Sequence, residues 1–344
     1  MTDTAHGAAS PLLSVCIPTY GRPQLLERAL RSVVERGQTE SDRVEVLVSD
    51  NSPDLNEALA LKWLSTWRGP TLYVPNRPDL GAIANFNQCI ARASGKFVLL
   101  LHDDDFLLAG GLEAVVEALE WVEDGDRALL FGVAVVDLDG HVRRRQEFRR
   151  DVRLAPEPAL RRLLSDSSFV RVPAIVFRRD TLEEIGGFDE SVGNPTDFDL
   201  LIRLFARHGV RCLPTTIAAY TVHSDAATSS MFHDTMIQTL TDLFERSIRT
   251  GILPERVVRQ CEADWFHQFI LGGTYRPLRA GETAAAKQVF RLFQLPVIRA
   301  LGQSPRWAPV RFLFEILLRL PSGVSRPLMR MVGRLSPERL WMPV

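Results

Sequence analysis

Apolar and polar positions follow two different periods along the first 125 residues. Short apolar runs rich in β-forming residues predict buried strands, at 12–20, 44–50, 71–76 and 96–105. Segments with apolar residues at helical spacing lie between and after them, at 22–36, 58–67, 80–94 and 111–123. This alternation predicts right-handed βαβ units and an α/β fold whose mainly parallel sheet has helices on both faces.

The pattern changes in the rest of the chain. Residues 128–148 predict a hairpin around an Asp139–Gly140 turn, and an amphipathic helix is predicted at 196–209. Residues 210–223 predict a strand pair, and from about Met231 onward only helices are expected. We therefore expect an α/β domain at 10–230 and a helical region at 231–344.

Composition narrows the class of protein. The 344 residues are 46% hydrophobic and 24% charged, as in ordinary globular proteins. The formal net charge of −1 gives no electrostatic reason to expect a nucleic-acid partner. Four widely separated cysteines, none in a CxxC pair, indicate neither a zinc site nor a redox dithiol and suit a reducing cytosol. The N-terminus lacks the pattern of a secretion signal, so we expect a cytoplasmic location.

The last segment, 291–344, is strongly basic. It contains nine arginines against two glutamates, and its apolar stretch VRFLFEILLRL has helical spacing. A basic amphipathic helix indicates peripheral contact with a membrane surface, here the inner face of the plasma membrane. A packing helix with a solvated basic face explains the pattern equally well.

The stretch LLLHDDDFLL at 99–108 places three carboxylates directly after an apolar run. Neighbouring carboxylates raise each other's pKa, so either a bound cation or a fully solvated turn is needed. Ligands of parallel α/β sheets bind beyond the carboxyl ends of the strands. Asp103–Asp105 lie at one such end, and Thr19, Tyr20 and Asp50 lie at others.

Four motifs in this order resemble the family 2 glycosyltransferases of the GT-A fold. They are SVCIPTYGRPQLLERALRSV, VEVLVSDNS, NRPDLGAIANFNQCIARASGKFVLLLHDDD and GGFDES followed by TDFDLLIRL. The resemblance covers roughly residues 12–230. It implies a metal-dependent, inverting transfer of a sugar from a nucleotide-diphosphate donor to a hydroxyl of a glycan or lipid-linked acceptor, in the synthesis of a surface polysaccharide or glycolipid.

The resemblance implies a role for each acidic residue of the third motif. Asp103 and Asp105 become the DXD pair that binds Mn²⁺ or Mg²⁺, cations that prefer oxygen ligands. Asp104 is assigned to the donor ribose or to the metal, and His102 is expected beside the carboxylates without ligating. The alternative is an acidic turn that caps the helix beginning at Gly111.

The donor site is expected to draw on the first three motifs. Asp50 would accept a hydrogen bond from the nucleotide base, or form an Asx turn with the residues that follow it. Pro18, Thr19 and Tyr20 would line the same pocket. Arg22 would face the phosphates or only begin a helix. Asn85 would face the nucleotide or remain a solvated polar position on its helix.

The last motif is expected to supply the chemistry. Asp197 is assigned as the general base, with an N-cap as its alternative, and Asp199 points elsewhere or caps the helix. His223 would complete the metal site or contact the diphosphate, with a structural histidine as its alternative. Residues 227–230 would suit a flap over the donor.

Two departures from the family pattern concern the residue before the predicted general base and the residues expected to bind the donor. Thr196 stands where many members have an acidic residue, and Asn85-Phe86-Asn87 replaces a segment that supplies a donor-binding arginine. Two other functions stay open, a sugar-phosphate nucleotidyltransferase and a non-catalytic nucleotide-sugar binding module. The loop IPTYGRPQ has one glycine and no lysine, which disfavours the nucleotidyltransferase.

Overall fold

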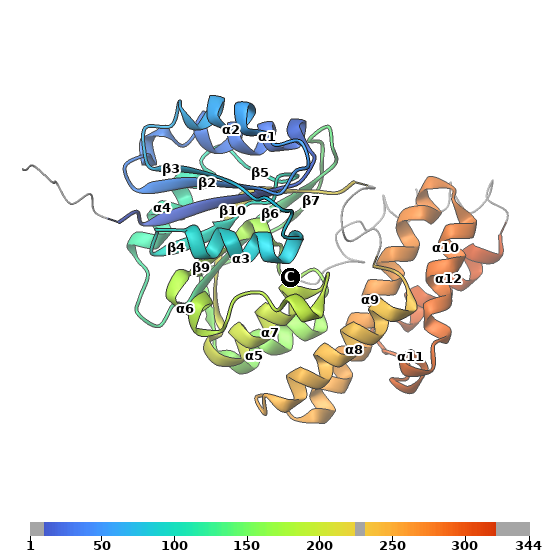
Figure 1. Ribbon diagram of the computed structural model, residues 1–344. Helices are drawn as coiled ribbons and strands as arrows, with labels where there is room; N and C mark the ends of the chain where they lie inside the picture. The colour runs from blue at the N-terminus through green and yellow to red at the C-terminus, as the bar shows by residue number, and fades with distance from the viewer. Residues whose placement is uncertain (1–9, 224–230, 321–344) are drawn as a thin grey trace, which may run out of the picture. The chain divides into compact units, whose positions relative to one another are not determined.

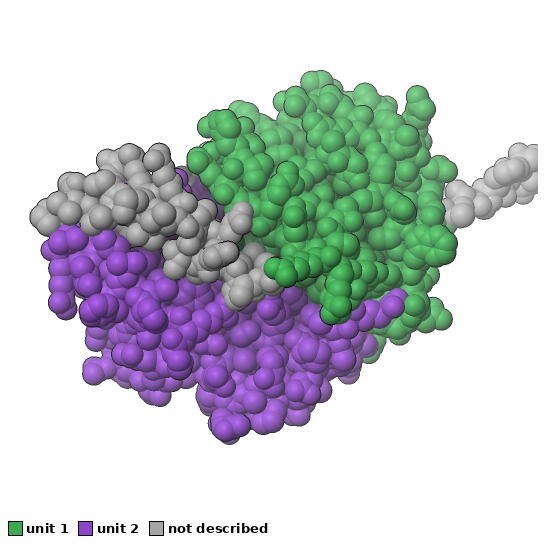
Figure 2. Space-filling view, turned by 180° about the vertical axis from the view of Figure 1, so that it is seen from behind, with its two compact units in different colours: residues 1–152, 171–191, 210–221 green, residues 153–170, 192–209, 222–344 purple. Residues whose placement is uncertain are grey.

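The computed structural model describes residues 10–223 and 231–320, and contacts divide the chain into two compact units. Figure 2 colours these units separately. Unit 1 comprises residues 1–152, 171–191 and 210–221, and unit 2 comprises residues 153–170, 192–209 and 222–344. Unit 2 therefore takes two segments from inside the predicted α/β domain, and the boundary at 230/231 remains a prediction.

The core of unit 1 is a mixed sheet whose strands run in the order β3-β2-β1-β4-β9-β6-β10-β5, with β7 paired to β6 (Figure 1). The strands are β1 (Leu13–Thr19), β2 (Val44–Asp50), β3 (Thr71–Pro75), β4 (Phe97–Leu100), β5 (Phe106–Leu107), β6 (Ala128–Val136), β7 (Val142–Gln146), β8 (Val152–Leu154), β9 (Ile175–Arg178) and β10 (Val210–Thr221). The first four pair in parallel, as their apolar runs predict, while β9 is antiparallel to both β4 and β6.

Two predicted strands differ from the structure. The strand pair predicted at 210–223 is wrong, because β10 is one continuous strand of 12 residues whose register against β6 shifts twice between Cys212 and Ala218. The strand predicted at 96–105 ends at Leu100, so the three aspartates follow it in a turn. The hairpin predicted around Asp139–Gly140 is confirmed by the pairing of β6 with β7.

Helices cover both faces of this sheet (Figure 1). They are α1 (Pro23–Val34), α2 (Glu57–Leu64), α3 (Ala82–Arg92), α4 (Gly111–Glu120) and α6 (Arg179–Glu184). Alternate side chains of a strand point to opposite faces. Val15 therefore packs in one core cluster with α1, α2 and α4, whereas the Cys16 thiol on the other face contacts the Cys89 carbonyl of α3. All four cysteines are buried and free, consistent with their predicted role as small apolar side chains.

Apart from Arg153 and Leu154 at the end of β8, the regular secondary structure of unit 2 in the described residues is helical. Its helices are α5 (Pro156–Ser165), α7 (Thr196–His208), α8 (Asp234–Arg249), α9 (Glu255–Ala280), α10 (Thr283–Phe290), α11 (Pro296–Ala300) and α12 (Ala308–Arg319). Phe198 of α7, Phe244 of α8 and Trp265 of α9 pack against one another with ring centroids 5.3–5.9 Å apart. The predicted change to helices after Met231 is confirmed up to residue 320. No helix in the described ranges is both long and apolar enough to cross a bilayer.

Candidate active site

The acidic motif forms a buried turn between β4 and β5. The Leu101 amide continues the β1–β4 pairing by donating to the Cys16 carbonyl, and the Asp105 amide closes the turn on the His102 carbonyl at 3.0 Å. Asp103 and Asp105 are 0% and 1% exposed, so the solvated-turn alternative is wrong. The helix-cap alternative is also wrong, because the N-cap of α4 is Gly110 and receives no side-chain hydrogen bond.

Asp103 is held by the last residue of β1 and by the loop that follows it. Its Oδ2 accepts a hydrogen bond from the Thr19 hydroxyl at 2.7 Å and a longer one from the Tyr20 amide at 3.4 Å. Its Oδ1 pairs with the Arg22 guanidinium at 2.5 Å. Burial raises the pKa of Asp103, and the Arg22 charge opposes that rise. These contacts make Asp103 the link between the loop and the acidic turn.

Arg22 neutralises two of the three carboxylates at once. Its second nitrogen lies 2.8 Å from Oδ2 of Asp104. Burial disfavours the guanidinium charge, but Asp103 and Asp104 outweigh it and raise the pKa of Arg22. Arg22 also occupies the residue before α1, as the helix-start alternative expected, without capping it.

Asp105 is the least satisfied of the three carboxylates. Its Oδ1 accepts the backbone N–H of Thr221, at the end of β10, at 2.8 Å. Its Oδ2 is buried and has no hydrogen-bond partner among the described residues. Burial, followed by the Asp104 charge, raises the pKa of Asp105 well above its usual value. An orphaned, buried carboxylate oxygen fits a bound cation.

His102, Asp104 and Asp105 form the group that could hold that cation. One ligand atom from each lies within 4.8 Å of the others. Asp103 and His223 are not in this group, and the structure instead gathers His102, which the sequence placed outside the ligands. The His102 ring stacks on Phe86 with centroids 5.1 Å apart, which fixes its orientation. The assignments of Asp103 and His223 to the metal stay predictions.

The remaining loop residues lie beside this turn. Pro18 and Thr19 are in β1, opposite Ser49 and Asp50 of β2. The Tyr20 side chain is 52% exposed, so its ring is available to a ligand. Their contribution to donor binding stays a prediction.

Asp50 has a structural role that the sequence left as one of two alternatives. It is buried, and its Oδ1 accepts the Ser52 amide at 2.8 Å, which is the predicted Asx turn. Its Oδ2 accepts the Asn56 amide at 2.6 Å and the Tyr73 hydroxyl at 2.9 Å. Burial and this hydrogen bond raise the pKa of Tyr73. Contact of Asp50 with a nucleotide base would use an acceptor position that these three donors leave open.

Asn85 is buried, so its solvated alternative is wrong. Its amide nitrogen donates to the Ser49 carbonyl at 3.1 Å, and its oxygen accepts from the Asn76 side chain at 3.0 Å. The side chain thus joins the ends of β2 and β3 to α3. Contact with the nucleotide stays a prediction.

The predicted base lies in unit 2, at the start of α7. Asp197 is exposed, and its Oδ1 accepts the Phe198 amide at 2.8 Å. The N-cap alternative is wrong, because that position is Pro195. Asp199 is buried and pairs with Arg203 at 2.7 Å and Arg246 at 3.0 Å. Of the two carboxylates, Asp197 is exposed and Asp199 is buried, and the role of Asp197 as general base stays a prediction.

A family model, Glycosyl transferase family 2, matches residues 14–186, about half of the chain. The chain belongs to glycosyltransferase family 2. The matched segment holds the predicted donor and metal residues of unit 1. Asp197 and His223, which both lie in unit 2, are outside it. His223 follows β10, and the predicted flap at 227–230 lies outside the described residues.

Relatives match the chain over part of their length. The uncharacterized protein MT1568 of Mycobacterium tuberculosis is 32% identical over 60% of this chain and 66% of its own. The abequosyltransferase RfbV of Salmonella typhimurium is 33% identical over 29% of this chain and 30% of its own. The GalNAc(5)-diNAcBac-PP-undecaprenol beta-1,3-glucosyltransferase of Campylobacter jejuni is 28% identical over 54% of this chain and 57% of its own.

Solved structures confirm the fold class of this family 2 member. S. aureus TarS in complex with UDP-GlcNAc covers 95% of this chain and 91% of its own, with a TM-score of 0.60 and 16% identity. The mannosyltransferase PcManGT from Pyrobaculum calidifontis, in complex with GDP-Man and Mn²⁺, covers 96% and 88%, with a TM-score of 0.54 and 19% identity. The GT-A fold expected from the motifs is therefore confirmed.

Sequence reasoning missed one side chain that ties α3 to the fourth motif of this family 2 member, Asn87. Asn87 donates to the Phe188 carbonyl and accepts its amide, both at 2.9 Å. Gly187 has φ +63°, and a Cβ there would lie 2.7 Å from the Asn87 oxygen. These two hydrogen bonds tie the start of the fourth motif, GGFDES, to α3. The available signal in the sequence was that Asn87 is a polar position on a helix, two residues after Asn85.

Proposed function

We propose that this protein transfers a sugar from a nucleotide-diphosphate donor to a hydroxyl acceptor, with a divalent cation and with inversion at the anomeric carbon. The observation that carries the proposal is the orphaned Asp105 oxygen, buried at the carboxyl-terminal edge of the sheet beside Asp104 and His102. Ligands of α/β sheets bind at this edge.

The cation would be Mn²⁺ or Mg²⁺, held by the carboxylates of Asp104 and Asp105 with His102 beside them. When bound, such a cation supplies charge neutralisation for the leaving diphosphate. The Thr221 amide holds Asp105 in place for this role, and Phe86 orients His102. The Mn²⁺ in the PcManGT complex supports the choice of metal.

Arg22 would act as a counter-ion before the donor arrives. It pairs with Asp103 and Asp104, so a cation and Arg22 compete for the Asp104 carboxylate. A donor diphosphate offers Arg22 a bidentate partner of its own. Donor and cation would then bind together more tightly than either alone.

Asp197 would accept the acceptor proton. It is exposed at the start of α7, whereas Asp199 is buried and forms ion pairs with two arginines. Asp50 would meet the nucleotide base, and Tyr20 would lie along it. The bound nucleotide sugars in the TarS and PcManGT structures support a nucleotide-sugar donor.

The acceptor would be a lipid-linked or surface glycan at the cytoplasmic face of the membrane. The name of the Campylobacter relative, which includes a diphosphoundecaprenol acceptor, supports this choice. On α12, Phe312 and Ile316 are 64% and 42% exposed while Phe314, Leu317 and Leu318 are buried. Apolar side chains on the outer face of a basic helix favour peripheral membrane contact over packing alone.

The test is a transfer assay with UDP-, GDP-, dTDP- and CDP-sugars, with Mn²⁺ or with EDTA, on a lipid-linked acceptor. We expect metal-dependent release of nucleoside diphosphate with one nucleotide class, and its loss in Asp105→Asn. Release of pyrophosphate from a nucleoside triphosphate would instead identify a nucleotidyltransferase. Donor binding by calorimetry without turnover on any acceptor would identify a binding module.

A further inference from the structure

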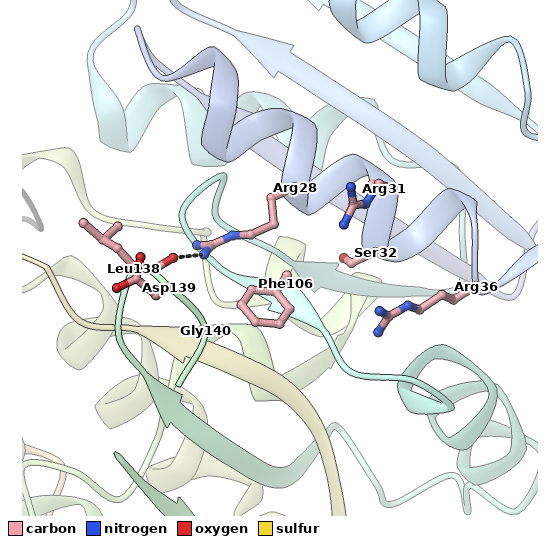
Figure 3. A pocket seen from close by; sticks show the side chains of 8 residues that line it. All are labelled: Arg28, Arg31, Ser32, Arg36, Phe106, Leu138, Asp139 and Gly140. Atoms are coloured by element: carbon pink, nitrogen blue, oxygen red, sulfur yellow. Dashed lines mark hydrogen bonds between the residues drawn. The ribbon is translucent and has the colours of Figure 1, made fainter. Parts of the chain in front are cut away.

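A cavity lies within unit 1, beside α1. Its volume is about 200 Å³, and it opens between α1, the β5 residue Phe106 and the β6–β7 turn (Figure 3). None of the residues that line it belongs to the proposed cation group. The proposed function leaves this cavity without a role.

Three arginines give the cavity a positive charge. Arg28, Arg31 and Arg36 line it, against the single carboxylate of Asp139 among its lining residues. Arg28, Ser32 and Arg36 recur every four residues, so they follow one side of the helix and its end. Figure 3 shows the guanidinium groups of Arg31 and Arg36 directed toward the space beside the Phe106 ring.

Two of these arginines are poorly neutralised within the chain. Arg31 lies 3.6 Å from Glu35, and both side chains are more than half exposed, so their attraction is weak. Arg36 is exposed and forms no ion pair in the described part of the chain. Their charges are therefore available to an external anion.

Arg28 forms the inner wall of the cavity. Its guanidinium packs over the Phe106 ring at 4.7 Å and donates to the carbonyls of Leu138 at 3.1 Å and Asp104 at 2.6 Å. The wall is thus a partly buried cation whose Nε–H has no hydrogen-bond partner among the described residues.

We propose that this cavity binds a phosphate group. Guanidinium forks match phosphate oxygens in charge and geometry, and a tetrahedral anion can accept from several directions at once. The source is either a free phosphate or a phospholipid headgroup. Leu138 and Val142 are 52% and 51% exposed on the adjoining turn and strand, which gives a headgroup an apolar surface nearby.

This site adjoins the acidic turn but has its own lining residues. Arg28 donates to the Asp104 carbonyl and to the Thr221 hydroxyl at 3.0 Å. Arg31 and Arg36 line the cavity and are not part of the cation group. Phosphate binding here needs neither the cation nor a sugar nucleotide. Phosphate binding in the cavity can therefore be disproved while glycosyl transfer is confirmed. Glycosyl transfer can equally be disproved while phosphate binding is confirmed.

The test compares Arg31→Gln/Arg36→Gln with the matched control Arg68→Gln/Arg92→Gln, which removes two exposed arginines of unit 1 outside the cavity lining. Calorimetry with inorganic phosphate in EDTA probes a free phosphate. Co-sedimentation with phosphatidylglycerol–phosphatidylcholine vesicles, against phosphatidylcholine alone, probes a headgroup. Circular dichroism checks that both variants fold.

We expect the cavity variant to lose about tenfold or more in affinity for at least one probe, since it removes two charged donors to the anion. The control should stay within about twofold of the unmodified chain. The probe that responds identifies the source of the phosphate. Equal losses in both variants, no loss in either, or no binding of either probe by the unmodified chain would overturn the proposal.

Discussion

Two buried aspartates at strand ends of the same sheet differ in how many hydrogen bonds their carboxylates accept. Asp50, at the end of β2, accepts hydrogen bonds from Ser52, Asn56 and Tyr73. Asp105, in the turn after β4, accepts one from Thr221 and leaves its second oxygen orphaned. A carboxylate supplied with donors by its own chain holds a loop together, whereas one left short of donors is prepared for an external ligand.

The largest expected effect is the loss of transfer activity in Asp105→Asn, which distinguishes a ligand-binding carboxylate from one that holds a loop. Asp105→Asn should lower transfer about a thousandfold, because several kcal/mol of charge stabilisation at the diphosphate depend on the cation it helps to hold. The variant should unfold at the same temperature or a higher one, because it removes a poorly compensated buried charge. Steady-state transfer and thermal unfolding measure the two effects.

Asp50→Asn is the matched comparison for that variant. The amide presents N–H groups where two backbone amides and a hydroxyl donate, so the free energy of unfolding should fall by about 1–3 kcal/mol. If Asp50→Asn keeps full stability while Asp105→Asn unfolds, the contrast between the two aspartates is wrong.

A similar contrast on α7 has the next largest effect. Asp197→Ala should reduce kcat about 100-fold or more, as expected for loss of a general base, while loss of its hydrogen bond from the Phe198 amide should lower stability by about 1 kcal/mol. Asp199→Asn should reduce stability by about 1–3 kcal/mol, because two arginines lose their buried partner. Full activity in Asp197→Ala would remove this residue from the mechanism.

The competition at Arg22 predicts a smaller change, in binding. Arg22→Met should raise the affinity for Mn²⁺ without nucleotide about tenfold, by freeing Asp104, and should lower the affinity for the nucleoside diphosphate. Electron paramagnetic resonance of free Mn²⁺ measures the first effect. Arg43→Met, which removes the surface pair with Glu120, is the control and should change neither affinity. Unchanged Mn²⁺ binding in Arg22→Met would show that Arg22 does not compete.

The smallest expected effect is on stability as a function of pH. The pKa of Asp105 in the folded chain lies above the ordinary 3.8, so the folded state holds the proton more tightly than the unfolded state. In EDTA the stabilisation that Asp105 gains from holding its proton is fully present below its ordinary pKa. This stabilisation is lost as pH rises through the raised pKa of the folded chain. Mn²⁺ binds the deprotonated form. Stabilisation by Mn²⁺ should therefore be larger near neutral pH than at mildly acidic pH, which thermal unfolding in both conditions tests.

The hydrophobic pattern predicted most elements of the sheet because buried parallel strands are short continuous apolar runs. It mistook β10 for two strands because polar residues and Pro214 interrupt its apolar pattern, while pairing with β6 keeps it extended. The unit assignment of α5 and α7 depends on contacts with helices far along the chain, which local periodicity does not contain.

The position of the acidic site was predictable from the sequence, but the contacts that each of its residues makes were not. Three adjacent aspartates at a strand end indicate a cation site from charge alone. Which of them lie in the group that could hold a cation depends on Thr19, Arg22 and Thr221, which approach from distant parts of the chain. For the same reason His102, oriented by Phe86, could not be recognised as a member of the group.

The donor that secures Asp105 belongs to the main chain of Thr221 and not to a side chain. Almost any replacement at that position would preserve it, because every residue except proline carries this N–H. A slip of β10 by one place would instead present the opposite edge of the peptide and withdraw the donor. Sequence drift at residue 221 is thus harmless to this contact, whereas insertions or deletions along β10 are not.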